Sequence, residues 1–81
     1  MKILQSNLEA KLARLNSIAG FENPEYSTVG AYCLDYAYGG VSLERYTNKH
    51  GNVKDIFNVG HVTKKELYNL MTAYECGINV S

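Results

Sequence analysis

Tryptophan is absent from this chain, proline occurs once, and the two cysteines, Cys33 and Cys76, lie far apart. Neither cysteine belongs to a paired-ligand motif, so the spacing predicts two free thiols and no metal site. No apolar run has the length of a membrane span or of a secretory leader. We therefore expect a soluble, cytoplasmic protein without a metal, a cofactor or a membrane partner.

An excess of charge of either sign is missing as well. Eight lysines and arginines balance eight aspartates and glutamates. Proteins that hold DNA or RNA through the phosphates need many cations, so we expect no nucleic-acid partner. The cations do gather in one part of the chain, where Arg45, Lys49, Lys54, Lys64 and Lys65 stand against Asp55 alone. This segment indicates either a local basic surface or an ordinary solvated one.

The length and the tyrosine content point to a small domain with a thin core. The chain has 81 residues, which predicts a single domain over residues 1–81. A chain this short buries only about 60% of its unfolded surface, and association of copies would add to that burial. Seven tyrosines stand against two phenylalanines. Tyrosine suits surfaces that become buried on binding, so we expect a homo-oligomer.

Residues 29–57 predict a β-hairpin followed by a third strand. Alternation puts the large side chains of Tyr32, Leu34, Tyr36 and Tyr38 on one face, which we expect to be buried. The small and polar side chains on the other face are Ala31, Cys33, Asp35 and Ala37. Gly39-Gly40 supplies the positive φ angles of a two-residue turn.

That turn fixes the partners across the hairpin. It would set Tyr38 opposite Val41, Tyr36 opposite Leu43, and Asp35 opposite Glu44. The last pair brings two carboxylates together, which is locally unfavourable. Three explanations are open: a neighbouring cation, a shifted register, or a binding site that uses both acids.

Helical patterns flank the hairpin on both sides. Leucines recur at helical spacing over residues 3–19, Ser6 and Glu9 match a capping box, and Gly20 suits a helix stop. The connection that follows contains Asn23-Pro24, a turn initiator.

The second helix has the clearest local signals. Thr63 and Glu66 match a capping box, and Gly77 is placed to end the helix. We therefore predict an α+β fold that consists of an N-terminal helix, a three-stranded antiparallel sheet with a central β-hairpin, and a C-terminal helix.

Binding is the function that the residues favour over catalysis. No motif joins Cys33, His50, His61 and the acids into a nucleophile and base, so we expect no enzyme. Tyrosines near cations could stack on a planar ligand and neutralise its phosphate, and the start of the second helix could hold an anion. The same surface could equally hold a protein. The candidate ligand-binding residues are Tyr32, Arg45, Tyr46, His50, Lys54, Lys64 and Lys65.

The tyrosines divide into two predicted groups. We expect Tyr36, Tyr38 and Tyr74 in the core, and we expect Tyr26, Tyr32 and Tyr46 at a contact surface.

One resemblance extends over most of the chain. The segment Ala37-Tyr38-Gly39-Gly40, then Leu43, Asn48 and Gly51, resembles a pattern in small accessory proteins of bacteriophages and prophages. Those proteins also open with a leucine-rich helix like residues 8–16 and close with a helix start like Lys64-Lys65-Glu66-Leu67. The family pattern more often has two glycines in the loop where this chain has Gly51 alone.

The resemblance implies a viral protein that acts in the cytoplasm of a bacterial host, and anti-defence is the activity it suggests. Two mechanisms then compete. The protein could be an oligomer that sequesters a nucleotide-derived immune signal, with pockets lined by tyrosines and basic side chains at subunit boundaries. Alternatively, it could bind and block a host defence or regulatory protein, which would need an exposed patch without a pocket.

Overall fold

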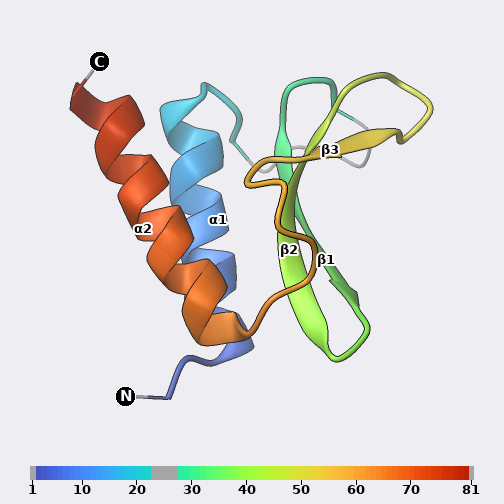
Figure 1. Ribbon diagram of the computed structural model, residues 1–81. Coiled ribbons are helices and arrows are strands. Elements are labelled where there is room, and N and C mark those ends of the chain that lie inside the picture. Colours follow the sequence, from blue (N-terminus) through green and yellow to red (C-terminus); the bar gives the residue numbers. More distant parts are fainter. Residues whose placement is uncertain (1, 23–27, 81) are drawn as a thin grey trace.

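The computed structural model describes residues 2–22 and 28–80, which form two helices packed on one face of a sheet (Figure 1). The elements in chain order are α1 (Gln5–Ile18), β1 (Tyr32–Ala37), β2 (Gly40–Tyr46), β3 (Val53–Asp55) and α2 (Lys64–Val80). The strands are antiparallel, in the order β1-β2-β3. The predicted α+β fold is thereby confirmed. The predicted turn at Asn23-Pro24 and the contact residue Tyr26 lie outside the described residues.

The helix α1 begins within the predicted range of residues 3–19 but without the predicted cap, and it ends as predicted. The capping box of Ser6 and Glu9 is wrong, because the helix starts after Leu4, whose N–H donates to Asn7 Oδ1 at 2.8 Å. Asn7 carries a short acceptor three residues into the helix, from where it reaches back to this N–H group. At the other end Gly20 has a φ of +92°, the left-handed stop that the sequence predicts.

The start of α2 agrees with the sequence and its end does not. Thr63 Oγ1 accepts a hydrogen bond from the Glu66 N–H at 3.1 Å, so the predicted cap forms. The predicted end at Gly77 is wrong, since the helix continues to Val80. Glycine in a helix costs about 1 kcal/mol relative to alanine, a cost that continued backbone hydrogen bonding can offset.

The hairpin reverses one residue earlier than predicted. Ala37 pairs with Gly40, so the loop is Tyr38-Gly39, with φ angles of +54° and +73° as a type I′ turn requires. Gly40 is therefore a strand residue, and a Cβ there would lie 2.9 Å from the carbonyl oxygen of Val62. Close approach of a distant segment, rather than turn geometry, is what requires this glycine.

The new turn position shifts every pair along the hairpin. Tyr36 faces Val41 and Leu34 faces Leu43, whereas Asp35 faces Ser42 and Glu44 faces Cys33. The predicted partners Tyr38–Val41, Tyr36–Leu43 and Asp35–Glu44 are therefore wrong. The register is therefore shifted, as one of the three explanations has it, and the two acids no longer stand directly opposite each other.

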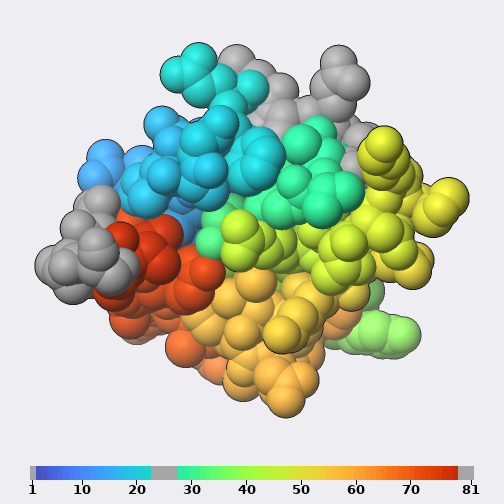
Figure 2. Space-filling view, turned by 90° about the horizontal axis from the view of Figure 1, so that it is seen from above, coloured from blue at the N-terminus to red at the C-terminus, as the bar shows by residue number. Residues whose placement is uncertain are grey.

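The tyrosines of β1 and of the turn become more exposed toward the turn. Tyr32 is 5% exposed, whereas Tyr36 is 44% exposed and Tyr38 is 96% exposed. The prediction that all the large side chains of this strand are buried is thus wrong for Tyr36 and Tyr38. The hairpin end, green in Figure 2, projects beyond the body of the molecule. Its tyrosines remain available to other molecules.

The core fills the space between the helix pair and the strands β1 and β2. Its fully buried apolar side chains are Leu8, Leu15, Val41, Leu43, Leu67 and Met71. Tyr32 joins the layers, because its hydroxyl lies 2.7 Å from that of Tyr74 and its backbone N–H and C=O both bond to the Asn16 side chain. Burial, and then the hydrogen bond with Tyr74, raises the pKa of Tyr32 to about 12.

The two helices are also joined by an ionic contact. Glu75 on α2, which is 8% exposed, accepts hydrogen bonds from Arg14 and from Lys11 Nζ, the latter at 3.3 Å. The hydrogen bond from Arg14, with a smaller contribution from Lys11, lowers the pKa of the Glu75 carboxyl. The carboxylate is therefore charged near neutral pH and holds α1 against α2.

Candidate functional site

A hollow open to solvent lies between the hairpin turn and the start of α2. Its volume is about 340 Å³, at the lower end of the range for small-ligand sites. The residues that line it are Tyr36, Ala37, Gly39, Gly40, Val41 and Lys64. We call it the hairpin hollow. It offers one aromatic ring, one cation and a stretch of backbone that two glycines leave uncovered.

Two long-range features place the walls of the hairpin hollow. Val62 pairs with Val41 through two backbone hydrogen bonds of 2.8 and 2.9 Å, which bring the start of α2 against β2. Tyr36 points to the helix side of the sheet, and partial burial, followed by the negative charge of Glu9, raises its pKa. The phenol is therefore neutral and can donate a hydrogen bond at neutral pH. Lys64, the first residue of α2, completes the hollow.

Tyr38 stands at the tip of the hairpin in an unusual conformation. Its φ of +54° lies in the left-handed region, which costs a side-chain-bearing residue about 1–2 kcal/mol. Its ring meets the His61 ring edge-on, with centroids 5.5 Å apart, and the residue is 96% exposed. Because the Tyr38 side chain is exposed, its burial within this chain does not compensate for the strained backbone conformation. A large aromatic side chain held in this way is suited to contact with another molecule.

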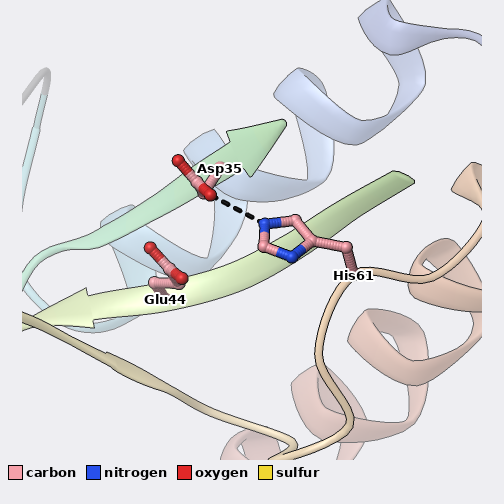
Figure 3. Close-up of side chains that lie close together, drawn as sticks. All are labelled: Asp35, Glu44 and His61. Carbon is pink, nitrogen blue, oxygen red and sulfur yellow. Dashed lines mark hydrogen bonds and ion pairs between the residues drawn. The ribbon is translucent and has the colours of Figure 1, made fainter. Parts of the chain in front are cut away.

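Three side chains gather on the opposite face of the hairpin (Figure 3). Asp35, Glu44 and His61, which we call the acid–histidine cluster, offer one ligand atom each, and these atoms lie within 4.8 Å of one another. His61 Nε2 is 2.7 Å from Asp35 Oδ2. Imidazole nitrogen and carboxylate oxygen are metal-ligating atoms, so these residues could hold a cation.

The residues that the sequence singled out do not form one site. Tyr32 is buried, and the Arg45 guanidinium lies 4.9 Å from the centre of its ring. Arg45 Nε–H also donates to the carbonyl oxygen of Gly30 at 2.7 Å. These contacts give Tyr32 and Arg45 a structural role, in which they hold β1, β2 and the preceding loop together.

The other predicted site residues lie at opposite ends of the molecule (Figure 1). Tyr46 ends β2 and hydrogen-bonds to Cys33, whereas His50 and Lys54 are exposed on the following loop and on β3. Lys64 and Lys65 begin α2 beside the hairpin turn, and both are exposed. Lys64 lines the hairpin hollow.

Residues that sequence reasoning missed make up most of the hairpin end. The sequence predicts Tyr36 and Tyr38 in the core, because alternation along a strand does not tell how much of its face other elements cover. Asp35 and Glu44 did give a signal, since their predicted apposition is unfavourable. His61 lies 26 residues from Asp35 along the chain, and no spacing rule joins the two.

The chain matches no protein-family model, no curated protein and no solved structure. Across the part of the chain that the structure describes, no helix is both long enough and apolar enough to cross a bilayer. The geometry of the hairpin end is therefore the main evidence on function.

Proposed function

We propose that this chain is a non-enzymatic binding protein and that the hairpin hollow takes a nucleotide-derived anion. The observation that carries the proposal is the pairing of Tyr36 with Lys64 across one hollow of about 340 Å³. A tyrosine ring can stack on a planar base, and an ammonium group can neutralise a phosphate. The first N–H groups of α2 lie next to Lys64 and also favour negative charge.

The lining of the hollow suits retention of a ligand rather than its conversion. Its described lining residues include no histidine, cysteine or carboxylate that could serve as a base or as an activated nucleophile. A protein that sequesters a signal needs affinity without turnover. The chemistry of the hollow is therefore consistent with binding alone.

The setting that we propose is counter-defence in the cytoplasm of a bacterial host, where the protein would sequester a nucleotide-derived immune signal. The setting rests on the resemblance to phage accessory proteins. We also propose a homo-oligomer, because the hollow is open and a second copy could cover a ligand held in it. The thin core of a short chain gives a further reason for association.

A panel of cyclic and linear nucleotides tests the ligand by thermal stabilisation of the protein. A ligand at one hundred times its Kd stabilises by about 2.7 kcal/mol, which is roughly 10–20 °C for a domain of this size. Lys64→Ala should remove the shift. Lys65→Ala is the matched control, because Lys65 is the next residue of α2, is also exposed and is not among the residues that line the hollow. Equal loss in both variants, or no shift with any nucleotide, would count against the proposal.

Tyr38 favours a second candidate function, the binding and blocking of a host protein. Tyrosine is enriched at the energetic centres of protein interfaces, and this one is fully exposed and held at a fixed turn. Tyr36→Ala and Tyr38→Ala separate the two functions. A small ligand in the hollow requires Tyr36 and tolerates loss of Tyr38, whereas a protein that grips the tip requires Tyr38.

A further inference from the structure

The acid–histidine cluster lies on the other side of the hairpin from the hollow and plays no part in the proposed function. Its members come from three segments: Asp35 from β1, Glu44 from β2, and His61 from the connection between β3 and α2 (Figure 3). Ligand atoms around a tetrahedral zinc ion lie about 3.4 Å apart, given bonds of about 2.0–2.2 Å. Atoms already within 4.8 Å need only small side-chain rotations to reach that geometry.

The charge of the cluster favours a cation. Two carboxylates share this small surface, and no lysine or arginine within the described ranges forms an ion pair with either of them. The Ser42 hydroxyl donates to Glu44 Oε2 at 3.2 Å, and His61 is the partner of Asp35. Arg45, the nearest cation in sequence, stacks on Tyr32 on the helix side of the sheet. A bound cation would relieve the repulsion between the acids.

The backbone holds His61 against the hairpin. Gly40 lets the chain at His61 and Val62 approach closely, since a Cβ there would lie 3.2 Å from the His61 Cβ. The loop before His61 is shaped by the Asp55 carboxylate, which accepts backbone hydrogen bonds from Phe57, Asn58 and Gly60 at 3.2, 3.2 and 2.9 Å. The third ligand is thus positioned before any ion binds, which lowers the entropic cost of binding.

We propose that Asp35, Glu44 and His61 bind a divalent transition-metal ion, Zn²⁺ above all, with water in the remaining coordination position. One imidazole and two carboxylates suit Zn²⁺, whereas Mg²⁺ and Ca²⁺ prefer oxygen ligands throughout. The ion would replace the hydrogen bond between His61 and Asp35. It would join β1, β2 and the connection, and it would thereby stiffen the hairpin end.

Calorimetric titration of the untagged, chelator-treated full chain with Zn²⁺ tests the site. We expect one ion per chain at micromolar concentration, together with a rise in melting temperature that a chelator reverses. Glu44→Gln and His61→Gln should each weaken binding by at least about tenfold. His50→Gln is the matched control, because His50 is exposed in the loop between β2 and β3 and lies outside the cluster.

The variants also separate this site from other zinc-binding groups. Binding that persists in both Glu44→Gln and His61→Gln would assign the ion to His50 or to the thiols and would overturn the proposal. Absence of binding to the wild-type protein would overturn it as well. A melting curve of each variant without metal shows whether the variant folds. If His61→Gln does not fold, Glu44→Gln still tests the site, because in the described part of the chain the Glu44 carboxylate hydrogen-bonds only to nearby Ser42.

Discussion

Gly40→Ala tests directly how the hairpin end is held. A methyl group at Gly40 would lie 2.9 Å from the Val62 carbonyl oxygen and 3.1 Å from the His61 carbonyl carbon. Both are backbone atoms, and Val62 is tied to Val41 by hydrogen bonds of 2.8 and 2.9 Å. The clash therefore cannot be relieved by a side-chain rotation. The segment must move away from β2 and weaken these bonds.

The expected cost follows from those contacts. Overpacking in a site that cannot relax costs about 1–3 kcal/mol, and loss of one backbone hydrogen bond adds about 1 kcal/mol net. We expect Gly40→Ala to lower the free energy of unfolding by about 2–4 kcal/mol. For a domain of this size that is a fall in Tm of roughly 10–30 °C.

Urea unfolding followed by circular dichroism measures this cost, and the neighbouring glycine is the control. A Cβ at Gly39 would meet nothing within 4 Å, but its φ is +73°, so Gly39→Ala should cost only the left-handed strain of about 1–2 kcal/mol. Asparagine tolerates left-handed geometry, so Gly39→Asn should be milder still, whereas Gly40→Asn should be as harmful as Gly40→Ala. If Gly40→Asn were tolerated as well as Gly39→Asn, both glycines would be turn residues and the contact with Val62 would be wrong.

Three further predictions concern other parts of the molecule. Asn16→Ala should lower the free energy of unfolding by about 2–3 kcal/mol, because it leaves the N–H and C=O of Tyr32 without their side-chain partner. An unchanged midpoint of urea unfolding would contradict this prediction. Tyr38→Asn should leave the free energy of unfolding unchanged or raise it by up to about 1 kcal/mol, because relief of the left-handed strain outweighs loss of the His61 ring contact. A large loss of stability in urea unfolding would refute the turn assignment. The pKa of Glu75 lies below its ordinary value of 4.5, so its ion pairs stabilise the fold above that pH. Wild type should be more stable than Glu75→Gln by about 1–2 kcal/mol at neutral pH, and this difference should shrink as pH falls through the lowered pKa. A difference that stays constant from neutral to acid pH would exclude this role.

Features that depend on neighbours along the chain could be predicted from the sequence. Thr63 begins a helix because its hydroxyl reaches an N–H three residues away, and Gly20 ends one because it adopts left-handed geometry. The order of helices and strands follows from periodicities of the same short range. These signals predicted the fold class but little of the candidate site. Of the predicted ligand-binding residues, only Lys64 is among those that line the hairpin hollow.

The register, the exposed tyrosines and the acid–histidine cluster could be recognised only once the chain was folded. Gly40 reads as a turn residue until Val62 is placed beside it, and that contact moves the turn to Tyr38 and Gly39. Tyr36 is left 44% exposed beside the start of α2, so an expected core residue becomes the wall of a hollow. The physical reason is the sequence separation over which each interaction acts. Hydrogen bonds within a helix join residues four apart, whereas burial and strand register depend on segments that meet only when the whole chain has folded.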